Sequence, residues 1–223
     1  MENKYISIAI DGPSASGKST VAKILAKDLS FVYVDSGAMY RAYTLAVLQA
    51  SLDPKNEEES NKLINKIDIS FDPLTNHILL DGKDVESEIR GNDVANNVSY
   101  IASYKNVRLF LVDLQRKIAK GKNIVMDGRD IGTYVLENAQ VKIFLVANED
   151  ERARRRFHEN QQKGIETTFE ACLENIKKRD YIDSHRSFCP LKPAPDSILL
   201  DSTKLSIKEV TNKIKEIIKE KGF

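Results

Sequence analysis

Short runs of consecutive apolar residues recur along the chain, and longer segments with a helical spacing of apolar residues separate them. Five runs have the length and the β-branched content of strands buried on both faces: 5–10, 31–34, 123–126, 141–146 and 198–200. The segments with helical spacing are 20–29, 36–50, 106–120, 149–162, 167–183 and 206–220. This alternation predicts an α/β fold in which helices flank a five-stranded parallel sheet on both sides.

The segment 67–85 departs from the alternation, because its apolar runs are short and are separated by turn residues such as Pro73, Asn76 and Asp81-Gly82. This pattern predicts a small antiparallel hairpin or three-stranded patch, and the polar segment 55–66 before it is typical of an exposed helix. We therefore expect a single domain over residues 1–223. Its core would comprise residues 1–54, 105–148 and 184–223, with a β-rich insertion at about 55–104 and a helical lid at about 149–183.

The composition is that of an ordinary globular protein. The chain has 223 residues, of which 41% are hydrophobic and 30% are charged, and its net charge of +1 gives no electrostatic reason to expect a nucleic-acid or membrane partner. Two cysteines are too few for a disulfide framework or a metal cluster. No apolar run approaches the roughly 20 residues that span a bilayer. We expect a cytoplasmic monomer.

The loop after the first predicted strand has the spacing G-x-x-x-x-G-K-[ST], which indicates a phosphate-binding loop. Its glycines let several backbone N–H groups face one anion, and the positive end of a helix that begins near Gly17 faces the same point. Lys18 would bring a full charge to the transferable phosphates, and the Ser19 hydroxyl could bind Mg²⁺. A turn without a ligand is the alternative, and the strand–loop–helix setting disfavours it. The loop residues are Gly12, Pro13, Ser14, Ala15, Ser16, Gly17, Lys18, Ser19 and Thr20.

Residues that follow the other predicted strands offer a second group of cations. Ser36, an expected helix N-cap, and Arg41 follow the second strand, and Arg129 follows the third. Because ligands of open parallel sheets bind beyond the carboxyl ends of the strands, Arg41 and Arg129 are suited to a second anion. The alternative for Arg129 is a structural bridge between Asp127 and Asp130.

Arg179, Asp183 and Arg186 have the spacing i, i+4 and i+7, which places them on one helical face. Two cations beside a carboxylate could bind a phosphate, a sugar hydroxyl and a base edge together. Taken alone, these residues fit a surface ladder of salt bridges better.

The segment 151–164 is rich in arginine. Arg152, Arg155 and Arg156 share a helical face, and Arg154 lies beside it, so they could belong to a lid that closes over transferring phosphates. A hinge would then lie near Lys163-Gly164, and a solvated basic helix is the alternative.

A second anion site indicates that the acceptor also carries a phosphate, and such an acceptor is ionised at neutral pH and needs no strong general base. Two other functions remain possible: a kinase that acts on a hydroxyl group, and a nucleotide-dependent switch. The chain matches the guanine-reading pattern N-K-x-D at residues 65–68, but this match follows a polar helical stretch, and none of the ten glycines completes D-x-x-G. The missing D-x-x-G and the second group of cations argue against the switch.

The stretches IAIDGPSASGKST, DSGAMYRA, DGRDIGT and KKRDYIDSHR, together with residues 89–108, resemble the bacterial cytidylate kinase family of P-loop nucleoside monophosphate kinases. The resemblance runs in order over nearly the whole chain and extends to the β-rich insertion. It implies a Mg²⁺-dependent transfer of the γ-phosphoryl group of ATP to CMP or dCMP, which gives CDP or dCDP in pyrimidine nucleotide metabolism.

The resemblance also implies roles for individual residues. Catalysis would involve Lys18, Arg129, Arg179 and a lid arginine, for which we choose Arg155. ATP would be bound by the loop Gly12 to Thr20 with Arg152 and Arg156, and Ser19 would hold the metal. The CMP site would comprise Ser36, Arg41, Arg129 and Arg179 at the phosphate, Asp183 at the sugar, and Ser99, Arg108 and Asp130 at the cytosine edge, with Arg186 nearby.

Overall fold

The computed structural model describes residues 5–223, which form two compact units. The first unit comprises residues 5–34 and 121–223, and the second comprises residues 35–120. The expected division into a core, an insertion and a lid stays a prediction. No helix of the described part of the chain is long and apolar enough to cross a membrane.

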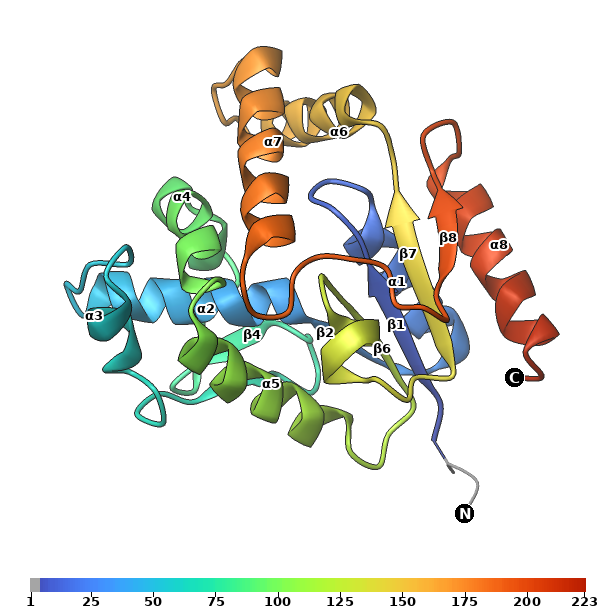
Figure 1. Ribbon diagram of the computed structural model, residues 1–223, viewed down its shortest axis with the longest axis horizontal. Coiled ribbons are helices and arrows are strands. Elements are labelled where there is room, and N and C mark those ends of the chain that lie inside the picture. Colours follow the sequence, from blue (N-terminus) through green and yellow to red (C-terminus); the bar gives the residue numbers. More distant parts are fainter. Residues whose placement is uncertain (1–4) are drawn as a thin grey trace. The chain divides into compact units, whose positions relative to one another are not determined.

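The first unit is built on a five-stranded parallel sheet with the order β2-β6-β1-β7-β8 (Figure 1). Its strands are β1 (Ser7–Asp11), β2 (Val32–Asp35), β6 (Ile124–Gly128), β7 (Val141–Val146) and β8 (Ile198–Asp201). All five predicted strands are confirmed, and no end differs by more than two residues. The central strand β1 is buried between two parallel neighbours, which explains its nearly continuous apolar sequence.

Helices α1 (Lys18–Leu29) and α8 (Ile207–Glu220) pack beside each other and share an apolar cluster with the sheet. Leu25 of α1 and Ile214 of α8 are fully buried there with Ile10 and Leu145 of the sheet. Each such side chain contributes about 1.5–3 kcal/mol through its removal from water. The start of α8 is fixed by a capping box, in which the Ser206 side chain accepts from the backbone of Glu209 while the Glu209 side chain accepts from the backbone of Ser206.

The first unit also contains the helical pair α6 (Glu149–Gln162) and α7 (Phe169–His185), which pack against each other, and the short π-helical turn η2 (Ile131–Val135). Asn148 caps α6 and Thr168 caps α7 through side chains that accept from backbone N–H groups. The turn that joins the two helices contains Gly164 with a φ of +67°. The predicted helices at 149–162 and 167–183 are thus confirmed, and the second of them extends to His185.

The second unit contains the predicted β-rich patch, a three-stranded antiparallel sheet with the order β3-β4-β5. Asp81 and Gly82 between β4 and β5 have positive φ values of 49° and 76°, which explains the Asp-Gly pair at this turn. The elements of the unit are α2 (Ser36–Gln49), α3 (Glu57–Asn61), β3 (Ile69–Phe71), β4 (Ile78–Leu80), β5 (Lys83–Asp84), η1 (Glu88–Arg90), α4 (Asn92–Ile101) and α5 (Lys105–Ala119).

Two features of the second unit differ from the expectation. Helix α4 was not predicted, because its many asparagines conceal the helical spacing of Val94, Val98 and Ile101, which are buried. The N-cap of α2 is Asp35 and not Ser36, since the Asp35 carboxylate accepts from the N–H of Ala38 at 2.9 Å. Ser36 is instead the first residue of the helix and is buried.

The close approach of Gly12 to β7 generates a testable prediction. A Cβ atom at Gly12, whose φ is +149°, would lie 2.1 Å from the carbonyl oxygen of Leu145. We expect Gly12→Ala to lower the free energy of unfolding by about 3 kcal/mol, because the clash is with backbone that cannot move without breaking the sheet. Gly121→Ala is the matched control, since Gly121 also has a positive φ of 73° but has open space around it. Strain alone should cost about 1 kcal/mol there. Urea denaturation of both variants would measure the difference, and equal losses would contradict the clash.

Candidate active site

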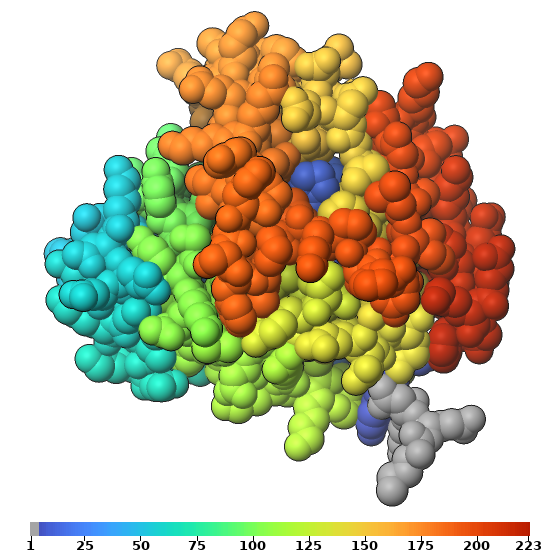
Figure 2. Space-filling view, viewed as in Figure 1, coloured from blue at the N-terminus to red at the C-terminus, as the bar shows by residue number. Residues whose placement is uncertain are grey.

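The phosphate loop joins the end of β1 to the start of α1 in the conformation that its glycines predict. Gly17 is the N-cap of α1 with a φ of 94°, in the left-handed region that favours glycine. The N-terminus of α1 therefore faces the loop, and its partial positive charge favours an anion there. In Figure 2, atoms of the blue N-terminal part of the chain lie in a hollow between the yellow and orange parts that carry α6 and α7.

Lys18 is buried at the first position of α1, and its ammonium group reaches back into the loop. Its Nζ donates to the carbonyl oxygen of Pro13 at 2.7 Å and lies 3.5 Å from the Ser16 hydroxyl. Burial and then the positive charge of Arg129 lower the pKa of Lys18 to about 7, while the carboxylates of Asp127 and Asp11 act to raise it. An added phosphate would act in the same direction as these carboxylates and favour the charged form.

Ser19 is paired with a carboxylate that the sequence analysis did not assign to it. Its hydroxyl donates to Asp127 Oδ2 at 2.7 Å, and the Tyr33 hydroxyl donates to Asp127 Oδ1 at 2.8 Å. Asp127 lies in the last part of β6 and is buried. A hydroxyl and a carboxylate at the end of neighbouring elements are the oxygen ligands that Mg²⁺ takes together with substrate phosphates. The sequence does contain an indication of this role, because Asp127 directly follows the apolar run 123–126.

The predicted lid arginines Arg152 and Arg155 contact the phosphate loop through its carbonyl groups. Arg152 is buried, and it donates to the carbonyls of Ala147 at 2.9 Å and Ser14 at 3.0 Å. Arg155 donates to the carbonyl of Ser16 at 3.1 Å and to that of Ser202 at 2.7 Å. These contacts are incompatible with a solvated basic helix for this face of α6.

The other members of the arginine-rich segment lie outside these contacts. Arg154 is exposed, and its Nη1 lies 3.6 Å from Glu151. Arg156 is partly buried, and its Nε lies 3.5 Å from Glu159. Lys163 and Gly164 belong to the turn between α6 and α7, and Lys163 is exposed there.

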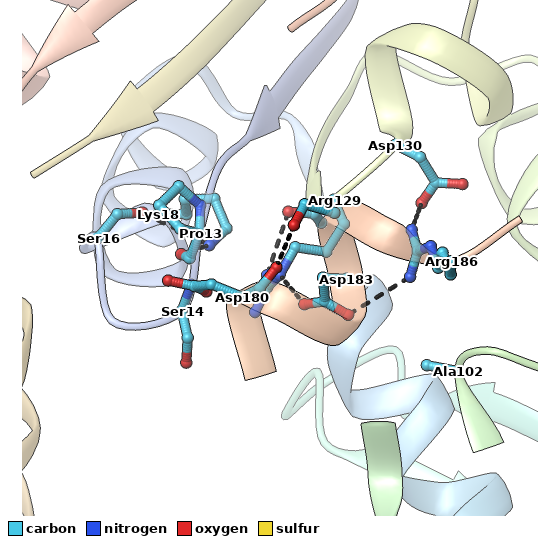
Figure 3. A network of polar contacts seen from close by, with 12 residues as sticks. Pro13, Ser14, Ser16, Lys18, Ala102, Arg129, Asp130, Asp180, Asp183 and Arg186 are labelled. Carbon is cyan, nitrogen blue, oxygen red and sulfur yellow. Dashed lines mark hydrogen bonds and ion pairs between the residues drawn. The ribbon is translucent and has the colours of Figure 1, made fainter. Parts of the chain in front are cut away.

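A second ionic network extends from Arg129 at the end of β6 to the end of α7 (Figure 3). Arg129 Nε donates to Asp183 Oδ2 at 2.9 Å, and Arg186 lies 3.5 Å from Asp183 and 3.6 Å from Asp130. Burial alone would raise the pKa of Asp183, but Arg129, Arg186 and Arg179 hold it below its ordinary value. The side chains of Asp130, Asp183 and Arg186 are nearly inaccessible, so a surface ladder of salt bridges is excluded.

Two details of this network differ from what the sequence suggested. Arg129 pairs with Asp183, 54 positions away, and this long-range pair was not foreseen. Arg186 does not belong to the face of α7, because it is the C-cap of that helix with an extended ψ of 142°. Its N–H still donates to the carbonyl of Ile182, which keeps its side chain beside Asp183.

Arg179 belongs to the same group of cations, but one of its buried donors is unsatisfied in the described part of the chain. Its Nε is buried and has no hydrogen-bond partner among the described residues. Burial and then the charge of Arg129 lower the pKa of Arg179 to about 10. A guanidinium group in this condition gains interaction energy when an anion arrives.

Two further carboxylates, both missed by the sequence analysis, position the loops. Asp11 ends β1 and accepts from the N–H groups of Ile131 at 2.8 Å and Gly132 at 2.7 Å. Asp180 on α7 accepts from the N–H of Ser14 at 3.0 Å and pairs with Arg152. No spacing rule links Asp180 to Ser14, because 166 positions separate them.

The other predicted CMP-binding residues lie in the second unit, where Arg108 is its most buried cation. Arg108 of α5 donates to the carbonyl of Ala102 at 2.9 Å, and its guanidinium carbon lies 5.2 Å from the centre of the Tyr40 ring. Ser99 of α4 is also buried, and Arg41 of α2 lies 3.4 Å from the carbonyl of Ile89.

Comparisons with known proteins identify the relatives of this chain. A family model described as cytidylate kinase matches residues 8–220. A cytidylate kinase of Enterococcus faecalis is 53% identical over 220 residues, which cover 98% of this chain and 97% of the relative. A cytidylate kinase of Bacillus cereus is 49% identical over 218 residues, which cover 97% of each chain.

Among solved structures, an uncharacterized protein from Eubacterium ventriosum aligns with a TM-score of 0.53 over 96% of this chain and 98% of its own. At 16% identity, that likeness shows the fold alone. The family match and the relatives extend over nearly the whole chain, and they confirm the resemblance inferred from the four quoted stretches and residues 89–108. The chain belongs to the cytidylate kinase family.

Proposed function

We propose that this protein transfers the γ-phosphoryl group of ATP to CMP, with dCMP as a second acceptor, and that it serves pyrimidine nucleotide metabolism. Its membership of the cytidylate kinase family supports the activity. The structural observation that carries the proposal is the presence of two cationic groups at the carboxyl end of one sheet. Lys18 belongs to the phosphate loop, whereas Arg129 and Arg179 belong to the neighbouring ionic network.

The phosphate loop is the proposed donor site. The N–H groups of Gly12 to Thr20 and the charge of Lys18 bind the phosphates of ATP. Arg152 and Arg155 act beside them from α6, where they also support the carbonyl groups of the loop, and Arg156 lies on the same helix. Arg155 is the arginine that we assign to the transferring phosphoryl group.

The ionic network is the proposed acceptor site. Arg129 and Arg179, with Ser36 and Arg41, bind the phosphate of CMP, and Asp183 accepts from the sugar hydroxyls. The cytosine edge is recognised by hydrogen bonds, since its amino group donates and its ring nitrogen and carbonyl accept. The residues that we assign to it are Ser99, Arg108 and Asp130, with Arg186 nearby.

The reaction requires alignment and charge neutralisation and no strong base. An oxygen of the CMP phosphate bonds to the γ-phosphorus of ATP, while the bond from that phosphorus to the β–γ bridging oxygen breaks. The CMP phosphate has a second pKa of about 6, so it is already ionised at neutral pH. Lys18 and the arginines hold the two phosphates in line and stabilise the charge on the transferring group.

The oxygen atoms beside the loop fit a Mg²⁺ ion. Ser19 and Asp127 would hold it, directly or through water, and Tyr33 keeps the Asp127 carboxylate in place. When bound, Mg²⁺ supplies positive charge to the phosphate oxygens of ATP. The cytoplasmic location and the monomeric state expected from the sequence stay predictions.

The first test is a panel of acceptors. We expect fast release of ADP from Mg²⁺-ATP with CMP and dCMP, slow release with UMP, AMP or GMP, and almost none without an acceptor. A coupled assay for ADP would measure these rates. Equal, slow release in every reaction would mean that the monophosphate is not the acceptor, and the proposal would fail.

Arg179 should be needed for the acceptor and unnecessary for the fold. We expect Arg179→Met to raise the KM for CMP by about 10- to 100-fold while the KM for ATP stays nearly unchanged, because a charge-assisted hydrogen bond to the acceptor is lost. The melting temperature should stay the same or rise, since burial and Arg129 already disfavour this charge. Steady-state kinetics and thermal denaturation would measure both effects.

Lys177→Met is the matched control for Arg179→Met, because Lys177 is an exposed cation on the same helix. It should change neither KM. An equal rise of both KM values in Arg179→Met would argue against a separate acceptor site.

Asp127 should determine the affinity for Mg²⁺. We expect Asp127→Asn to raise the Mg²⁺ concentration for half-maximal activity by about tenfold, and Tyr33→Phe to have a smaller effect through the position of the carboxylate. Electron paramagnetic resonance of Mn²⁺ in the presence of ADP would measure metal binding without turnover. Unchanged metal affinity in Asp127→Asn would remove Asp127 from the metal site.

A further inference from the structure

Asp180 lies in the candidate active site, but it has no role in the proposed reaction. It lies on α7, and its carboxylate reaches the phosphate loop, where Figure 3 shows it between the loop residues and Arg129. Oδ1 accepts from the N–H of Ser14 at 3.0 Å. Oδ2 pairs with the Nη1 of Arg152, whose guanidinium also binds the carbonyl of Ser14. The side chains of Asp180 and Arg152 therefore hold both backbone polar groups of Ser14.

The partners of this carboxylate are groups that suit a phosphate. The Ser14 N–H belongs to a loop whose N–H groups are suited to an anion, and Arg152 is a buried cation beside it. Asp180 also acts over a longer range. Burial alone would lower the pKa of Arg129, but the carboxylates of Asp183 and Asp180 raise it above its ordinary value. Asp180 is likewise among the carboxylates that favour the charged form of Lys18.

We propose that Asp180 is a stand-in anion, a carboxylate of the chain that takes the place of a nucleotide phosphate when the site is empty. It satisfies a loop N–H and the Arg152 guanidinium, and it reduces the repulsion among the cations of the site. When a polyphosphate binds, Asp180 gives up these partners to it. This inference rests on the proposed function, because it takes the loop to be the ATP phosphate site.

A stand-in anion competes with the ligand that it imitates. The apparent dissociation constant equals the intrinsic one divided by the fraction of molecules that are free to bind. If the Asp180 contacts are formed in about nine of ten empty molecules, they weaken binding about tenfold. Removal of the charge should therefore tighten the binding of a polyphosphate. A merely structural carboxylate predicts the opposite sign, since its loss would disorganise the loop and weaken binding.

The test is the affinity of the full chain for the ATP analogue with an imido group between the β- and γ-phosphorus atoms, measured by isothermal titration calorimetry. Asp180→Asn keeps the shape and an oxygen that can accept from Ser14 but loses the charge. We expect it to bind the analogue about tenfold more tightly than the unchanged protein. Glu174→Gln, an exposed carboxylate on the same helix, controls for net charge and should leave the affinity nearly unchanged.

Thermal denaturation makes the test independent of a folding defect. Without ligand, Asp180→Asn should melt at a lower temperature, because the cations lose their counter-charge, and the analogue should raise its melting temperature by more than in the unchanged protein. Asp180→Glu, which keeps the charge, should not bind more tightly. Equal or weaker binding of the analogue by Asp180→Asn would overturn the inference. Absence of binding by the unchanged protein would overturn the assignment of the phosphate loop itself.

Discussion

Lys18, Arg129 and Arg179 are cations that repel one another and are withdrawn from water, and the fold must keep them close before any phosphate is present. The pKa values of Lys18 and Arg179 are lowered by burial first and by this repulsion second. Two carboxylates of α7 oppose it. Asp183 pairs with Arg129, and Asp180 pairs with Arg152. A site that binds two phosphates must carry more positive charge than the empty protein tolerates easily, so internal anions are a structural requirement.

Two arginines of α6 fix the orientation of peptide groups in the phosphate loop. Each peptide group presents an N–H at one side and a carbonyl at the other, so a loop whose N–H groups point inward leaves its carbonyls to be satisfied elsewhere. Arg152 donates a hydrogen bond to the carbonyl of Ser14, and Arg155 donates one to the carbonyl of Ser16. These contacts attach the first turns of α6 to the loop. If the predicted lid closes, it must therefore either move without these turns of α6 or break these bonds.

The sequence predicted the sheet, the phosphate loop and most helices because each depends on short-range spacing. Apolar runs identify strands buried on both faces, and a helical spacing of apolar residues identifies α8. Helix α4 escaped because its polar residues are poor helix formers and only Val94, Val98 and Ile101 mark its buried face. The functions of Asp127 and Asp180 could not be predicted from the sequence for a different reason. Their partners Ser19 and Ser14 lie 108 and 166 positions away, and only the folded chain brings these pairs together.

The alignment of the two proposed phosphate sites depends on how β1 and β6 are connected. Asp11 precedes the phosphate loop on β1, and it lies opposite Gly128 on the neighbouring strand β6. Adjacent strands are about 4.8 Å apart, so the loop and Arg129 begin from points that the sheet fixes. The Asp11 carboxylate adds a second link, because it binds the N–H groups of Ile131 and Gly132, just beyond Asp130. Burial raises its pKa to about 7, although these two N–H groups act to lower it. The chain thus buries a carboxylate at a cost in free energy. In return it fixes the distance between the proposed donor loop and the proposed acceptor arginine, on which in-line transfer would depend.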